Sequence, residues 1–119
     1  MSNMFRLIAI VVFAGFIASV ATPVFADDSK AWLKIISPKN GAVMSSKKDI
    51  IIEYEMNPGP KGDHVHFYVD GGNAGLMRKN KGSFNMTKLG PGERELTVKL
   101  VNKIHVPIGV EASVKITVK

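Results

Sequence analysis

Hydrophobic and polar residues alternate with a period of two along most of the chain beyond residue 30. Successive side chains of a β-strand point to opposite faces, so this alternation predicts strands with one buried face and one exposed face. In Asp49–Glu55, for example, Ile50, Ile52 and Tyr54 would face the core. The predicted strands are Ala31–Ile36, Asp49–Glu55, His64–Val69, Gly75–Lys79, Ser83–Leu89, Glu95–Val101 and Glu111–Val118.

Turn-forming residues separate these segments at intervals of about eight to twelve residues. The stretch DGGN at residues 70–73 predicts a hairpin, because Asp-Gly supplies the positive φ angles that tight turns need. No helix is expected after residue 26. About seven short strands in one small domain indicate an all-β protein, a single antiparallel β-sandwich.

The segments DIIIEYE, HVHFYVDG and LGPGERELTVKLVN resemble three strand regions of bacterial immunoglobulin-like or fibronectin-type-III-like domains. The chain also resembles small secreted bacterial proteins that carry an H-x-H motif on one strand. This resemblance implies that the third strand pairs with the sixth and the sixth with the seventh. The disulfide of antibody domains is absent, because the chain has no cysteine.

The first 26 residues have the order of a secretory signal peptide. Arg6 precedes the apolar run LIAIVVFAGFIASVA, and small residues at Val24 and Ala26 mark a cleavage site after Ala26. We therefore expect an exported protein, periplasmic or secreted, whose mature domain spans 27–119. An uncleaved N-terminal anchor is the alternative.

The charge of the chain is basic but evenly spread. The formal net charge is +6, and removal of the signal peptide would remove only Arg6 from the basic residues. The lysines form no stripe interleaved with aromatic residues, so we expect no nucleic-acid partner. We expect a monomer that has no membrane span once the signal peptide is cleaved.

The histidines are the strongest candidates for a binding site. His64 and His66 share one face of the predicted third strand with Tyr68, opposite the apolar set, and should lie on the solvent side. If the strand order holds, the loop that carries His105 lies at the same end, beside Asp63 and near Glu111. These five residues predict a copper or zinc site, since imidazole is the commonest ligand for both ions.

Other interpretations stay open at this point. Lys99 should neighbour the histidine pair and oppose cation binding, and the histidines could instead bond to Thr97 or the loop backbone. Met56 is a conceivable soft ligand, whereas Met77 and Met86 are expected in the core.

The function predicted from the sequence is a non-catalytic binding or accessory module. No serine, histidine and acid stand at a spacing that suggests nucleophilic catalysis. A competing prediction is an interaction module that docks on an envelope protein through residues 103–110 or a sheet edge, with the histidines incidental. The apolar residues of that loop would either fold back over the sandwich or form an exposed tip.

Overall fold

A computed structural model describes residues 30–119 as two packed β-sheets and no helix. The smaller sheet is antiparallel and has the order β1-β3-β6. Its strands are β1 (Trp32–Ser37), β3 (Ile51–Asn57) and β6 (Lys81–Asn85).

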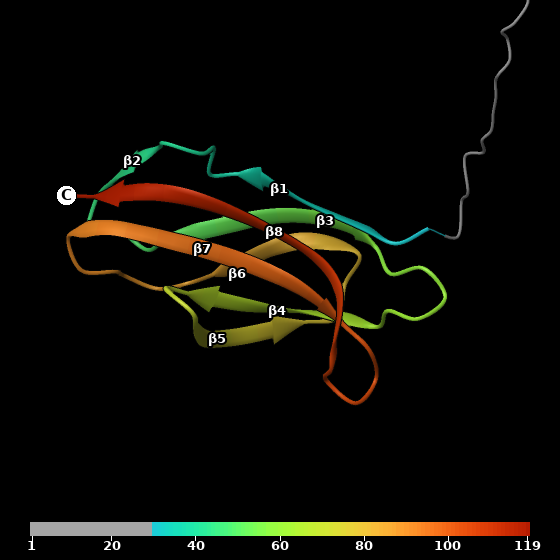
Figure 1. Cartoon of the computed structure of the whole chain (residues 1–119). Helices are drawn as coiled ribbons and strands as arrows, with labels where there is room; N and C mark the ends of the chain where they lie inside the picture. Colours follow the sequence, from blue (N-terminus) through green and yellow to red (C-terminus); the bar gives the residue numbers. More distant parts are fainter. Residues whose placement is uncertain (1–29) are drawn as a thin grey trace, which may run out of the picture.

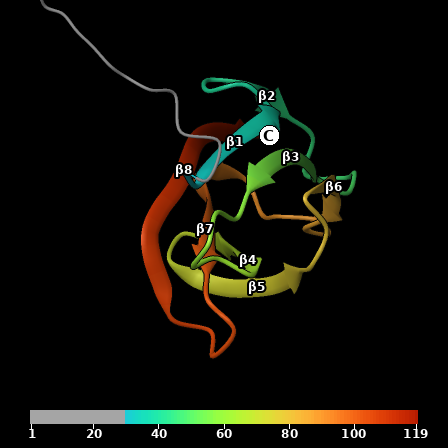
Figure 2. The same cartoon turned by 90° about the vertical axis from the view of Figure 1, so that its right-hand side faces the viewer.

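The larger sheet has five strands in the order β2-β8-β7-β4-β5. Its strands are β2 (Val43–Met44), β4 (His64–Val69), β5 (Gly72–Met77), β7 (Gly92–Val101) and β8 (Pro107–Val118). All its pairs are antiparallel except β2 with β8. Seen from the end, this sheet curves around one side of the molecule, with β1, β3 and β6 on the other (Figures 1 and 2).

The core lies between the sheets and comes from the alternate residues that the sequence pattern marks. From β3 it takes Ile52 and Tyr54, and from β4 it takes Val65 and Phe67, all 1% exposed or less. The apolar faces of β7 and β8 complete it. The predicted immunoglobulin-like β-sandwich is therefore confirmed, including the pairing of β4 with β7 and of β7 with β8.

Two stacked aromatic rings pack between the sheets near their edge strands β5 and β6. Phe84 of β6 stacks on Phe67, with ring centroids 4.1 Å apart. A Cβ atom at Gly75 of β5 would lie 2.5 Å from the ring of Phe84. Only glycine therefore fits at this point of the edge strand.

Each predicted strand has a counterpart, but several bounds differ: the strand predicted at Gly75–Lys79 is β5 at Gly72–Met77, and the one predicted at Ser83–Leu89 is β6 at Lys81–Asn85. His64–Val69 is a strand as predicted, and the Asp70-Gly71 turn joins it to β5 with positive φ at both residues. The two-residue β2 was missed because two residues carry no alternation. β8 begins at Pro107, earlier than predicted, because the hairpin pairing continues to Val101 opposite Pro107.

The predicted signal peptide, 1–26, lies outside the described residues, so cleavage and export stay predictions. Within 30–119 there is no helix long and apolar enough to span a membrane.

Candidate metal centre

Three histidine side chains meet at one end of the larger sheet. His64 and His66 come from β4, and His105 comes from the tip of the hairpin that joins β7 to β8. Nε2 of His64 lies 3.1 Å from Nε2 of His66 and 3.1 Å from Nδ1 of His105. The third side of the triangle, from Nε2 of His66 to Nδ1 of His105, is 3.0 Å. We call this group the histidine triad.

The register of the sheet explains how residues 39 and 41 positions apart come together. His64 pairs with Val101, the last residue of β7, so the chain leaves β7 beside His64. The hairpin tip then carries His105 onto the same face as both β4 histidines. The prediction that one end of the sandwich gathers all three histidines is confirmed.

The tip conformation that presents His105 is one that ordinary residues avoid. His105 has φ of 68°, in the left-handed region, where a residue with a Cβ costs roughly 1–2 kcal/mol. Asn102 holds the tip: its side-chain oxygen accepts hydrogen bonds from the backbone N–H groups of Ile104 and Val106, both at 3.0 Å. The backbone carbonyl of Asn102 accepts another hydrogen bond from the backbone N–H of His105 at 3.0 Å. Glycine fits such a backbone best, and histidine is, with asparagine and aspartate, one of the other residues that are enriched there.

His64 is fully buried, which corrects the expectation that both β4 histidines face solvent. The ring of His105 lies edge-on to His64, with centroids 4.7 Å apart, and the hairpin tip covers it. The strand pattern places His64 opposite the core, but it cannot show that a distant turn folds over that face.

Asp63 fixes the orientation of His64. Its Oδ2 lies 2.9 Å from Nδ1 of His64, and Nη1 of Arg78 lies 3.2 Å from the same oxygen. An ionised carboxylate only accepts hydrogen bonds, so Nδ1 of His64 must carry the proton. Nε2 of His64 is then a lone-pair donor that faces the other two histidines.

This role differs from the direct ligation that the sequence suggested for Asp63. Its carboxylate is on the far side of the His64 ring from the triad nitrogens, as in the carboxylate–histidine pairs that orient metal ligands. The hydrogen bond from His64 lowers the pKa of Asp63 below its ordinary value, and the charges of Arg78 and Lys103 act in the same direction. Arg78 was missed in the sequence, because no pattern there links it to the histidines.

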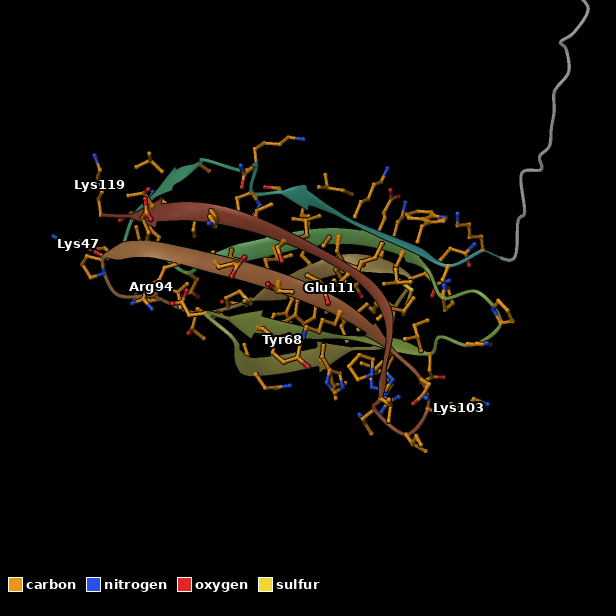
Figure 3. All side chains as sticks on the ribbon, in the orientation of Figure 1. Lys47, Tyr68, Arg94, Lys103, Glu111 and Lys119 are labelled. Atoms are coloured by element: carbon orange, nitrogen blue, oxygen red, sulfur yellow. The ribbon has the colours of Figure 1, made fainter. Side chains whose placement is uncertain are left out.

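Glu111 does not join the triad. It lies opposite Lys99 on β8, while Lys99 lies opposite His66, so two strand spacings of about 4.8 Å each separate the two backbones. Figure 3 shows Glu111 on β8, away from the hairpin tip that carries Lys103. Glu111 was predicted to join the site because it follows the His105 loop closely in sequence. In the sheet, however, it does not contact the triad.

The other side chains considered from sequence also have defined places. Lys99 lies over the ring of Tyr68, with Nζ 5.0 Å from the centroid, and Thr97 bonds to the hydroxyl of Ser113 at 2.8 Å. Tyr68 shares the face of His66, with ring centroids 6.5 Å apart. Met56 and Met86 are core residues, 4% and 5% exposed, and Met77 packs against the same core.

No arrangement of protons can make all three contacts of the triad ordinary hydrogen bonds. Each imidazole nitrogen has either one N–H or one lone pair, and each of the three nitrogens faces two others. A shared cation can satisfy three lone pairs at once. Nε2 of His64, Nε2 of His66 and Nδ1 of His105 would hold such an ion. The triad could therefore hold a metal ion.

The electrostatics favour neutral histidine at His66. Burial lowers the pKa of His66 below its ordinary value of 6.5, and the charge of Arg78 acts in the same direction. Neutral imidazole is the form that binds a metal ion, so His66 should be ready to bind at neutral pH.

The comparison with solved structures supports a fibronectin-type-III-like fold. Fibronectin(III)-like modules of CbhA from Clostridium thermocellum match with a TM-score of 0.61 and 26% identity, over 73% of this chain and 95% of that chain. The extracellular domain of a putative hybrid two-component system from B. thetaiotaomicron matches with a TM-score of 0.53 and 12% identity, over 83% of this chain and 16% of that chain. The second likeness shows the fold alone. No family model matches the chain, and no curated protein matches it in sequence.

Proposed function

We propose that this protein is an exported, non-catalytic binding module that holds one copper or zinc ion through the histidine triad. The observation that carries the proposal is the triangle of three imidazole nitrogens 3.0–3.1 Å apart. Three histidines with one further position free is a common arrangement for zinc, and imidazole also suits copper.

Two features around the triad support this function. The first is the Asp63 carboxylate, which fixes the proton of His64 on Nδ1 and leaves Nε2 free to bind. The second is the left-handed backbone of His105 at the hairpin tip, where its ring meets both β4 histidines. Neither feature contributes to the sandwich core.

The choice between the two metals follows their general affinities. Sites built from nitrogen ligands bind Cu²⁺ more tightly than Zn²⁺, so the isolated protein should prefer copper when both are offered. Which ion the protein carries in a cell depends on supply as well as on affinity.

The test is a titration of the purified protein with Cu²⁺ and Zn²⁺, with the bound metal counted by elemental analysis. We expect one ion per chain, bound with a submicromolar dissociation constant, and loss of at least about hundredfold in affinity for His66→Gln. Lys115→Gln is the matched control, because Lys115 lies opposite Glu95 on β8, far along the strand from the hairpin tip. Weak binding that is equal in wild type and His66→Gln would reject a metal function.

A further inference from the structure

Exposed apolar side chains gather around the histidine triad. Leu76 lies opposite His66 on β5, and Ile104 and Val106 flank His105 at the hairpin tip. Their exposed fractions are 40%, 75% and 48%. They are three of the seven large hydrophobic residues that are exposed within 30–119, and we call them the apolar rim. By contrast, Ile108 and Val110 of the same segment pack against the core.

Cationic side chains stand just outside the apolar rim. Arg78 follows β5, Lys99 lies opposite His66, and Lys103 precedes Ile104. Two carboxylates lie among these cations: Oδ2 of Asp63 accepts hydrogen bonds from His64 and Arg78, and Glu111 lies opposite Lys99 on β8. Three cations against two carboxylates leave one net positive charge. The surroundings of the triad therefore favour a negatively charged partner.

The described residues place no fourth metal ligand beside the triad. Within 30–119, the group of histidine, cysteine and carboxylate donors that converges here contains only the three histidines. Asp63 faces the opposite nitrogen of His64, and Glu111 lies two strands away. A fourth ligand must therefore be water or a group from outside this part of the chain.

We infer that the apolar rim is a docking surface for an acidic, apolar segment of another protein, whose carboxylate completes the coordination of the metal. This inference rests on the proposed function. Apolar side chains of the partner would cover Leu76, Ile104 and Val106, while the cations outside the rim would attract its acidic residue. A carboxylate oxygen is an ordinary fourth ligand for zinc beside three imidazoles.

The experiment uses protein loaded with Co²⁺, whose visible absorption reports its ligands, and two capped peptides, Ser-Leu-Asp-Val-Ser and Ser-Leu-Asn-Val-Ser. We expect the aspartate peptide to change the Co²⁺ spectrum and to bind at least about tenfold more tightly than the asparagine peptide. Omission of the metal should weaken the aspartate peptide by a similar factor. Acetate at the same concentration should have no comparable effect.

A double variant separates the apolar rim from the metal. Ile104→Ser/Val106→Ser should weaken the aspartate peptide about tenfold and leave Co²⁺ affinity unchanged. Val43→Ser is the matched control, because Val43 is 64% exposed and belongs to β2, at the far edge of the sheet.

The outcomes distinguish the two proposals. If Co²⁺ and the other metals fail to bind, the proposed function fails. If the metal binds but both peptides bind equally, or neither binds, only the docking inference is overturned. Acetate that matches the aspartate peptide would show a site for small anions and would likewise overturn it.

Discussion

Two tight turns at opposite ends of the β4–β7 ladder use strained backbone in different ways. Asp70, in the turn after β4, and His105, in the turn after β7, both have left-handed φ angles, 50° and 68°. Oδ1 of Asp70 accepts a hydrogen bond from the backbone N–H of Glu95 at 2.8 Å, and its Oδ2 accepts one from Arg94 at 2.9 Å. The ring of His105 instead meets two other histidines, and Asn102 holds its backbone.

The difference teaches how to separate a structural turn from a functional one. At the Asp70 turn, the strained residue contributes side-chain bonds that stabilise the same end of the sheet. At the His105 turn, a neighbour supplies those bonds, and the strained residue is free to present a nitrogen donor to the triad. At the His105 turn, the left-handed backbone together with the contact of its ring with two other histidines fits a role in binding.

The largest expected effect comes from His105→Gly. It removes one of three ligands, so the affinity for Cu²⁺ should fall at least about hundredfold. Glycine also suits the left-handed turn, so the free energy of unfolding without metal should rise by about 0.5–1 kcal/mol. Titration and urea denaturation measure the two effects.

The control for this substitution is Thr87→Gly. Thr87 has φ of 65° and follows β6, in the smaller sheet. It should show a similar gain in stability with no change in metal affinity. A loss of stability in His105→Gly would mean that the histidine serves its turn as Asp70 does, and the contrast between the turns would disappear.

The next effect is that of Asp63→Asn. The amide can no longer hold the His64 proton on Nδ1 as a carboxylate does, so metal affinity should fall about 10- to 100-fold while all three ligands remain. Isothermal titration calorimetry with Zn²⁺ measures this change. Unchanged affinity would show that Asp63 has no part in orienting His64.

Asp70→Ala should act on stability alone. It removes the hydrogen bonds that Asp70 accepts from the Glu95 amide and from Arg94, so the free energy of unfolding should fall by about 1–2 kcal/mol. Metal affinity should stay at the wild-type value, because the turn lies at the other end of β4. A parallel loss of metal affinity would show that the two ends of the ladder are coupled.

The smallest expected effects are on the pH dependence of stability. His66 and Asp70, at opposite ends of β4, should act in separate pH ranges. The pKa of His66 is lowered on folding, so its contribution to stability is present above its ordinary value of 6.5 and is lost as pH falls below it. The pKa of Asp70 is lowered by the Glu95 amide and by Arg94, so its contribution is lost only below 3.8.

Melting temperatures of the metal-free protein between pH 7.5 and 5 test this separation. His66→Gln should flatten the decline in that range, whereas Asp70→Asn should leave its slope unchanged. An equal slope in all three proteins would mean that His66 titrates alike in the folded and unfolded states.

The sequence predicted those parts of the molecule that depend on alternation and strand order. β4 was located to the residue, and the convergence of His64, His66 and His105 followed from pairing β4 with β7. The burial of His64 and the position of Arg78 could not be predicted, because both depend on how a turn and a side chain fold across neighbouring strands. The prediction that Glu111 joins the site was wrong, because closeness along the chain does not determine how many strands separate two residues in a sheet.

The positions of the three histidines along the chain also bear on how the protein would resist unfolding. A metal ion bound between β4 and the β7–β8 tip would close a loop of the polypeptide between His66 and His105. Such a cross-link is reversible, and its stabilisation grows with the free metal concentration, by about 2.7 kcal/mol at a hundred times the dissociation constant. The folded protein would then be more stable at high metal concentration than at low metal concentration.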